Sequence, residues 1–265
     1  MKAGWIGFPK DDSDFWVAAE KYAKIGYRGL EGGETLLNDG NVDENIHRLH
    51  ELGLEVLTVS ASVDEISKDI ESVIKRAKSL HSGRATLWAS SVLGFWHKEQ
   101  VSKDVFAEEV NVMEKAASVL AKEGIKLCFH NHNAEFQLLY EGITVNDFMM
   151  NNSEHLCLEL DIGWVDCAGV DPCSVLKKYA DRITAVHMKD YIPKESVRYS
   201  DDIMMTIPTF TSIGTGVVDV KSALKCMTEI GLEWVVYEQD NLRNLNNDES
   251  LTLSYLYMKE TGLVE

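Results

Sequence analysis

Residues able to bind a metal ion or to transfer a proton follow four short apolar runs in the second half of the chain. These runs are Ile125–Phe129, Leu156–Leu160, Ile183–Val186 and Trp234–Tyr237. A parallel barrel gathers the carboxyl ends of its strands into one ring, so side chains placed there converge although they lie far apart in sequence. Three carboxylates and an imidazole around one point repel one another unless a cation lies between them. The pattern therefore predicts a divalent metal site made by Glu135, Asp161, His187 and Glu238.

This predicted ligand set has three carboxylates, one imidazole and no thiolate. Oxygen-rich ligation with one nitrogen favours Mn²⁺, with Mg²⁺, Co²⁺ and Zn²⁺ as alternatives. Two coordination positions would remain for oxygens of a substrate. The expected chemistry is proton transfer next to a carbonyl group, because a bound cation stabilises the enediolate that forms when the proton leaves.

Further polar and aromatic residues accompany these four. His130 and His132 lie within six residues of Glu135, and a single histidine after an apolar strand would more often be held by backbone groups. The cluster as a whole favours a functional site. We expect Glu135, Glu238 and His130 to be the candidates for moving a proton. The expected substrate-binding residues are Glu31, His132, Trp164 and Lys189.

The elements that must position these residues repeat as a short apolar run followed by an amphipathic segment. The amphipathic segments Asp14–Ile25, Val105–Glu123 and Val220–Ile230 have apolar residues at spacings of three and four, which is typical of helices. Glycines that end such segments are expected to adopt left-handed caps, at Gly26, Gly53, Gly124 and Gly231. The predicted strands are Ala3–Phe8, Tyr27–Leu30, Glu55–Ser60, Ala85–Ala89, Lys126–His130, Leu156–Asp161, Thr184–Met188 and Trp234–Glu238.

Eight strands that alternate with helices predict a single α/β domain over residues 1–265, a (β/α)₈ TIM barrel. An open doubly wound sheet fits less well, since no GxGxxG follows the first strand. One segment departs from the repeat. Between His187 and Val220 we expect a long irregular loop of about 25 residues at the C-terminal face of the barrel, serving as a lid or a substrate wall.

Composition excludes several classes of partner. The 265 residues carry 43 acidic and 26 basic side chains, a formal charge of −17, so nucleic acid is a poor candidate as partner. The sequence has no uncharged apolar stretch long enough to indicate a membrane span, and the start of the chain lacks the features of a secretory signal. The five cysteines show no CxxC spacing, and we interpret them as reduced thiols of a cytoplasmic protein. Whether the chain forms a homo-oligomer is an open question.

Seven segments together resemble the sugar phosphate isomerase/epimerase group of the xylose isomerase-like TIM barrels. They occur in order from the second strand to the eighth, so the resemblance spans nearly the whole chain. The segments are Gly26-Tyr27-Arg28-Gly29-Leu30-Glu31, His130-Asn131-His132 with Glu135-Phe136, Leu160-Asp161-Ile162-Gly163-Trp164, Gly169-Val170-Asp171-Pro172, His187-Met188-Lys189-Asp190, Gly214-Thr215-Gly216-Val217-Val218-Asp219 and Trp234-Val235-Val236-Tyr237-Glu238-Gln239-Asp240.

The resemblance implies a metal site of the type Glu–Asp–His–Glu, which maps onto Glu135, Asp161, His187 and Glu238. In ketose epimerases the first glutamate ends the fifth strand itself, where this chain has His130. If His130 binds the metal instead, the site would hold two carboxylates and two imidazoles.

The resemblance implies a small sugar or cyclitol as partner. The reaction implied is a metal-dependent isomerisation or epimerisation of a sugar or keto-sugar. Dehydration or lysis, of the inosose dehydratase or 3-keto-glycoside type, is the alternative. A non-catalytic sugar-binding barrel and a phosphodiesterase fit less well.

Overall fold

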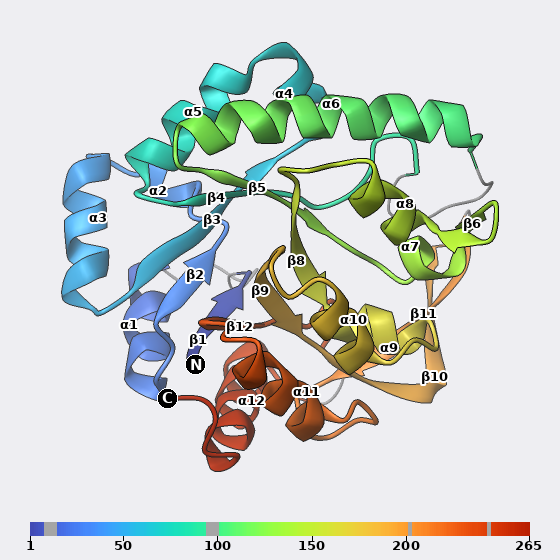
Figure 1. Ribbon diagram of the computed structural model, residues 1–265. Coiled ribbons are helices and arrows are strands. Elements are labelled where there is room, and N and C mark those ends of the chain that lie inside the picture. Colours follow the sequence, from blue (N-terminus) through green and yellow to red (C-terminus); the bar gives the residue numbers. More distant parts are fainter. Residues whose placement is uncertain (8–14, 94–100, 201–202, 243–244) are drawn as a thin grey trace.

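Eight parallel strands close into a barrel, which confirms the predicted (β/α)₈ fold (Figure 1). The structure, a computed structural model, describes residues 1–7, 15–93, 101–200, 203–242 and 245–265. The strands hydrogen-bond in the order β1-β12-β9-β8-β5-β4-β3-β2, and β2 also pairs with β1. They are β1 (Lys2–Ile6), β2 (Gly29–Glu31), β3 (Glu55–Ala61), β4 (Arg84–Leu87), β5 (Lys126–His130), β8 (Cys157–Asp161), β9 (Ile183–Met188) and β12 (Trp234–Tyr237).

Helices surround the barrel on its outside (Figure 1). The longest, α6, begins after Ser102, whose side chain accepts a hydrogen bond from the backbone N–H of Val105. The helices are α1 (Phe15–Ile25), α2 (Thr35–Asn38), α3 (Val42–Glu51), α4 (Val63–Lys68), α5 (Ile70–Ser79), α6 (Lys103–Lys122), α7 (Ala134–Gln137), α8 (Val145–Asn151), α9 (Ile162–Cys167), α10 (Pro172–Lys178), α11 (Val220–Glu229) and α12 (Asn247–Glu260).

The predicted glycine caps are confirmed. Gly26, Gly53, Gly124 and Gly231 all have positive φ angles, between 72° and 134°. This conformation turns the chain out of a helix and into the next strand without the steric cost that a Cβ would add. Two predicted element ends, at Phe8 and Asp14, lie outside the described residues.

The prediction of an irregular loop between His187 and Val220 is wrong, because most of this segment forms an antiparallel hairpin. Its strands are β10 (Asp190–Ser200) and β11 (Ile203–Thr211), and the pairing register shifts between Ile192 and Ser196. A bulged strand does not keep a regular alternation of apolar and polar residues, so the sequence pattern missed it. A smaller hairpin, β6 (Leu139–Tyr140) with β7 (Ile143–Thr144), follows α7.

Asp190 fastens the large hairpin to the barrel. Its buried carboxylate accepts hydrogen bonds from four backbone N–H groups of the hairpin and of the turn that follows it. Oδ1 accepts from Tyr191 at 2.9 Å and from Val218 at 3.0 Å. Oδ2 accepts from Gly214 at 3.0 Å and from Gly216 at 2.8 Å. The turn comes from one of the segments that carry the resemblance.

A layer of polar side chains fills the inside of the barrel below the carboxyl ends of the strands. Glu31, Glu159 and His187 are fully buried there. The Thr86 hydroxyl donates to Glu159 at 2.5 Å and lies 2.7 Å from the hydroxyl of Thr58. Burial, and then the charge of Glu31, raise the pKa of Glu159 to about 8, so this carboxyl group is protonated at neutral pH.

Strand register aligns the residues at the carboxyl ends of the strands. Asp161, the last residue of β8, is the direct partner of His187 on β9. His187 in turn pairs with Val236 on β12, two residues before Glu238. Neighbouring strands therefore bring these three side chains to the same mouth of the barrel.

The prediction that all five cysteines are reduced is wrong for two of them, since Cys173 of α10 and Cys226 of α11 form a disulfide. These residues lie 53 positions apart, and the sequence offered no spacing signal for the pair. Cys128, Cys157 and Cys167 are free thiols. In the described part of the chain, no helix has the length and apolar character needed to span a membrane.

Candidate metal centre

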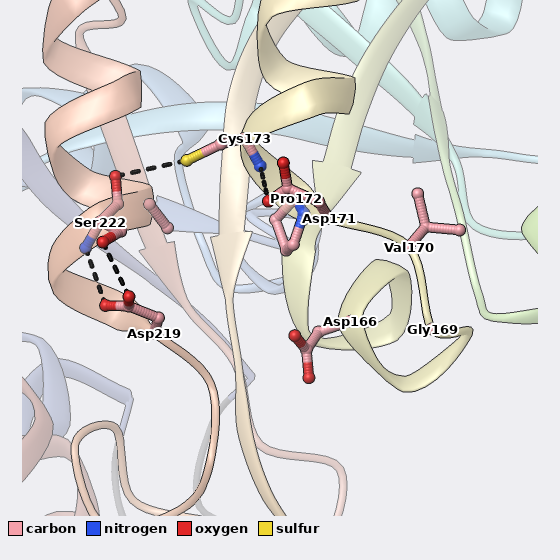
Figure 2. A pocket seen from close by; sticks show the side chains of 9 residues that line it. Asp166, Gly169, Val170, Asp171, Pro172, Cys173, Asp219 and Ser222 are labelled. Atoms are coloured by element: carbon pink, nitrogen blue, oxygen red, sulfur yellow. Dashed lines mark hydrogen bonds between the residues drawn. The ribbon is translucent and has the colours of Figure 1, made fainter.

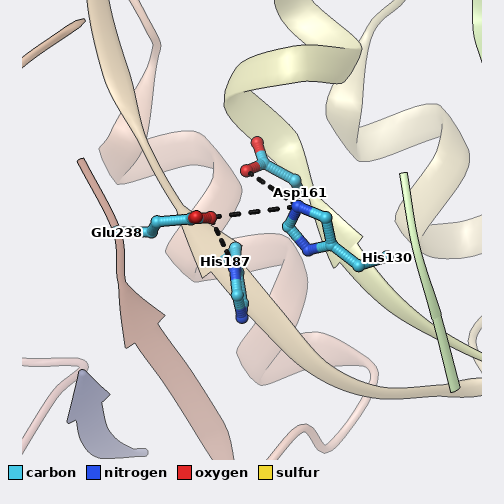
Figure 3. Close-up of side chains that lie close together, drawn as sticks. All are labelled: His130, Asp161, His187 and Glu238. Atoms are coloured by element: carbon cyan, nitrogen blue, oxygen red, sulfur yellow. Dashed lines mark hydrogen bonds and ion pairs between the residues drawn. The ribbon is translucent and has the colours of Figure 1, made fainter. Parts of the chain in front are cut away.

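Four side chains from four strand ends meet at the carboxyl mouth of the barrel (Figure 3). They are His130 at the end of β5, Asp161 at the end of β8, His187 in β9 and Glu238 after β12. One ligand atom of each lies within 4.8 Å of the corresponding atoms of the other three. Three of them belong to the predicted ligand set, and the fourth is His130, the alternative that the resemblance left open.

Asp161 is held by two sets of hydrogen bonds. Its Oδ1 accepts from the backbone N–H of Trp164 at 2.8 Å and so caps the N-terminus of α9. The side chain of Asn131 bonds to both backbone groups of Asp161, at 2.9 and 3.1 Å. The other carboxylate oxygen, Oδ2, accepts no hydrogen bond among the described residues and belongs to the cluster. Sequence reasoning missed Asn131, although it lies inside the His130-Asn131-His132 motif.

His130 is buried and uncharged. Its Nε2 lies 3.9 Å from both Asp161 Oδ2 and Glu238 Oε2, and its Nδ1 has no hydrogen-bond partner in the described part of the chain. Burial, and then the nearby His187, lower its pKa well below the ordinary value. The ring of Trp88 lies 5.4 Å from that of His130 and 5.9 Å from that of His187. Trp88 was also missed, although its place near the carboxyl end of the predicted strand Ala85–Ala89 could have indicated it.

His187 is bonded at both ring nitrogens. Nδ1 lies 2.7 Å from Glu238 Oε2, and Nε2 lies 2.7 Å from Glu31 Oε2. Burial alone would lower the pKa of His187, but the two carboxylates outweigh it and raise the pKa well above its ordinary value. The imidazole is therefore protonated on both nitrogens when no ion is bound.

Lys189 adds a cation to the cluster. Its Nζ lies 3.0 Å from Asp161 Oδ2, 3.0 Å from Glu238 Oε2 and 2.7 Å from Asp240 Oδ2. Burial opposes its charge, but Asp161, Asp240 and Glu238 raise its pKa above the ordinary value. From the sequence, a metal ion alone was expected to balance the negative charge of the carboxylates. Charged Lys189 balances part of that charge.

The donor set fits a divalent ion even with Lys189 present. Asp161 and Glu238 are the carboxylates of the cluster, with Asp240 beside it and Glu31 directly below it. The nearby cations are Lys189 and protonated His187. Carboxylates therefore exceed cations. Two imidazole nitrogens and two carboxylate oxygens suit Zn²⁺, Co²⁺ or Mn²⁺. The side chain of Glu238 is 17% exposed, against at most 3% for the other three, so the cluster meets solvent at Glu238.

Glu135 lies outside this group of four. It belongs to the first turn of α7, where its Oε2 accepts a hydrogen bond from the backbone N–H of His132 at 2.8 Å. Glu135 is 1% exposed, and burial raises its pKa to about 7. In the geometry His130, which ends β5, belongs to the group of four, whereas Glu135, which follows a turn, does not.

The predicted substrate-binding residues have different surroundings. Trp164 packs edge-on against Phe210 of β11, with ring centroids 4.9 Å apart, and its ring lies 5.6 Å from that of His132. Lys189 Nζ lies 5.3 Å from the ring of Trp164 and 4.9 Å from that of Phe210. Glu31, in contrast, is fully buried beneath the cluster.

A separate surface pocket of about 370 Å³ lies between the start of α10 and the start of α11 (Figure 2). The segment Gly169-Val170-Asp171-Pro172 lines it. Asp171 caps α10 by accepting from the backbone N–H groups of Cys173 and Ser174, both at 3.1 Å. None of the lining residues belongs to the metal cluster. This motif therefore supports the fold at α10.

Comparisons with known proteins agree with the architecture. A family model described as xylose isomerase-like TIM barrel matches residues 19–259. An inosose dehydratase of Klebsiella pneumoniae is 30% identical over 169 residues, which cover 59% of this chain and 54% of that protein. The matched region thus spans about half the length of that relative. An inosose dehydratase of Clostridium botulinum is 25% identical over 290 residues, covering 98% of this chain and 96% of the relative.

Solved structures show the same fold at low sequence identity. A sugar phosphate isomerase/epimerase of Parabacteroides distasonis superposes with a TM-score of 0.77 and 17% identity, covering 100% of this chain and 95% of that one. The IolI protein, solved with a bound zinc atom, has a TM-score of 0.74 and 16% identity, with 98% of each chain covered.

Proposed function

Because this chain belongs to the xylose isomerase-like TIM barrel family, we propose that it is a metal-dependent enzyme that moves a proton next to the carbonyl of a sugar or cyclitol. The observation that carries the proposal is the convergence of His130, Asp161, His187 and Glu238 at the mouth of the barrel. These four residues would hold the ion. When bound, the ion would polarise the carbonyl of the substrate and stabilise the negative charge that develops on its oxygen.

Three residues of the chain then have distinct tasks. Glu135 is the proposed proton acceptor and donor, because it stands outside the ligand group and ionises with a pKa of about 7. Lys189 would hold a substrate oxygen while keeping its bond to Asp240. Trp164 would supply an apolar face below the β10–β11 hairpin, since its ring already packs against Phe210.

The fate of the proton separates two reactions. Loss of the α-proton and of the hydroxyl group on the neighbouring carbon forms a C=C bond and releases water, which is dehydration. The similarity to inosose dehydratases of Klebsiella pneumoniae and Clostridium botulinum supports this outcome for a cyclitol. Return of the proton to the other face or to the neighbouring carbon is epimerisation or isomerisation, and the shared fold of the Parabacteroides distasonis isomerase/epimerase is compatible with this outcome.

A paired substitution tests the metal site. Asp161 and Asp171 both cap a short helix, but only Asp161 belongs to the cluster. Asparagine also caps helices well, so both Asp161→Asn and Asp171→Asn should fold. After loading with Zn²⁺ or Mn²⁺ and dialysis, metal content should fall to near zero in Asp161→Asn and stay at the wild-type level in Asp171→Asn. Equal metal content in the two variants would refute the site.

A second experiment tests the reaction. The metal-loaded enzyme is incubated in D₂O with a panel of ketoses, inososes and 3-keto-glycosides. Deuterium uptake without loss of water would favour isomerisation or epimerisation, whereas loss of water with a new C=C absorption would favour dehydration. Glu238→Gln should lower turnover by about 10²–10⁴-fold with the fold intact. A metal-loaded protein that shows neither reaction on the panel would contradict the proposal of an enzyme of this class.

A further inference from the structure

The ring of His187 faces a second carboxylate on the side turned away from Glu238. Its Nε2 lies 2.7 Å from Glu31 Oε2, and both side chains are fully buried. Glu31 comes from the end of β2, on another part of the barrel wall. The sequence predicts that Glu31 contacts the substrate, and in the structure its Oε2 is directed at His187. The bond to His187 suggests a different role.

Glu31 is itself supported from within the barrel. Glu159 lies beside it in the same fully buried layer, where ligand atoms of the two carboxyl groups lie within 4.8 Å of each other. Glu159 in turn accepts from the hydroxyl of Thr86. Glu31 is therefore a buried carboxylate whose Oε2 is directed at Nε2 of His187.

An imidazole that binds a metal ion uses the lone pair of one nitrogen and keeps a proton on the other. The proton needs an acceptor, and a carboxylate acceptor both fixes the tautomer and makes the ligating nitrogen more basic. In His187, Glu31 accepts the proton on Nε2. Nδ1, which faces Glu238, is then the nitrogen that turns its lone pair toward the cluster.

We infer that Glu31 is a positioning residue for the metal centre: it holds His187 in the tautomer and orientation in which Nδ1 is the ligand. The inference rests on the proposed function, because it presumes that His187 binds an ion. A competing arrangement uses the other group of the barrel, in which ligand atoms of Glu31, Glu159 and His187 lie within 4.8 Å of one another. An ion there would require the lone pair of Nε2, and Glu31 and Glu159 would be direct ligands.

Two matched substitutions distinguish these arrangements. Glu31→Gln and Glu159→Gln make the same chemical change in the same buried layer. Glu31 lies 2.7 Å from Nε2 of His187, whereas Glu159 Oε1 lies 3.8 Å from it. Glutamine also resembles the protonated form of Glu159, so this variant should fold. If Glu31→Gln fails to fold, Glu31→Asp is used as the test variant instead, because it keeps the charge on a shorter side chain.

Binding of Co²⁺ to the ion-free proteins is measured by isothermal titration, and the visible absorption of bound Co²⁺ reports the ligand geometry. We expect Glu31→Gln to weaken Co²⁺ binding by about 10–100-fold and to shift the absorption bands. Glu31→Asp should weaken binding less. Glu159→Gln should bind Co²⁺ within about threefold of the wild type, with unchanged bands.

Each outcome decides a different question. Wild-type affinity and an unchanged spectrum in Glu31→Gln would overturn the positioning role and leave the metal site standing. Equal weakening in Glu31→Gln and Glu159→Gln would overturn it in favour of an ion held by the lower group. Absence of Co²⁺ binding by the wild-type protein would refute the proposed function, and the inference with it.

Discussion

Substitution of Asp190 by asparagine should destabilise the protein strongly, although it changes a single atom of the side chain. Both carboxylate oxygens of Asp190 accept two backbone N–H groups each. In asparagine one of these oxygens becomes an NH₂ group. Two backbone N–H donors then face another donor, and neither orientation of the amide avoids this conflict.

The magnitude follows from the two hydrogen bonds that must be lost. A hydrogen bond to a charged acceptor contributes about 1.5–3 kcal/mol, so the loss is about 3–6 kcal/mol. An unfolding entropy of about 2.1 cal/mol/K per residue gives about 0.56 kcal/mol/K for this chain, which converts the loss to a fall in Tm of roughly 5–10 °C. Because the hairpin carries Phe210 against Trp164, the wall of the site should loosen as well.

Urea unfolding, followed by tryptophan fluorescence and by circular dichroism, measures this loss. Asp219→Asn is the matched control, since Asp219 also accepts a backbone N–H, from Ser222 at 3.0 Å, but caps an exposed helix start where asparagine serves equally well. We expect the control to lie within about 0.5 kcal/mol of the wild type. A loss below about 1 kcal/mol in Asp190→Asn would refute the view that this carboxylate anchors the hairpin.

Three other outcomes follow from the site and its supports. Gly163→Ala should cost about 1–3 kcal/mol in urea unfolding, because the new Cβ would lie 2.7 Å from Lys189 Cβ and 2.8 Å from its carbonyl oxygen. Gly83→Ala, whose Cβ would meet nothing within 4 Å, is the control, and equal stabilities of the two variants would count against this close approach. Burial raises the pKa of Glu135 from 4.5 to about 7, so the folded protein binds this proton more tightly than the unfolded chain does. The stability that the bound proton contributes is fully present below pH 4.5 and is lost as the pH rises through 7. Relative to the wild type, Glu135→Gln should therefore gain about 3 kcal/mol in urea unfolding between pH 4 and pH 8, and a difference that does not change with pH would contradict the shift. The affinity for Zn²⁺ should rise with pH, because Glu31 and Glu238 raise the pKa of His187 and the ion must displace its Nδ1 proton. If calorimetric titrations give the same affinity at every pH, His187 is not a ligand.

The fold was predictable because its signals are local and repeated. Short apolar runs alternate with amphipathic segments, and glycines mark the change from helix to strand. The hairpin was not predictable in this way, because the register shift after Ile192 removes the alternation by which a strand is recognised. The Cys173–Cys226 disulfide depends on the packing of α10 against α11, and no sequence spacing encodes that contact.

The candidate site was predictable where a residue lies at a strand end. Asp161, His187 and Glu238 were placed together because register fixes their heights on neighbouring strands. Glu135 does not belong to the group of four, and its position was not predictable, since a turn after a strand can direct its side chains in several ways. The contact of Lys189 with two carboxylates of the cluster is a property of side-chain rotamers, which the residue spacing does not determine.

Closure of the barrel has a consequence for how the protein is made. β1 pairs with β12 from Lys2 with Trp234 onward, so the first strand acquires this partner only after roughly 230 further residues have been synthesised. At about 5–20 residues per second, the outer edge of β1 remains open on the ribosome for roughly 10–50 s. An open parallel edge is a template for pairing with another chain. Slower translation of the second half of the gene should therefore lower the yield of native protein, and a chaperone that covers the nascent first strands should restore it.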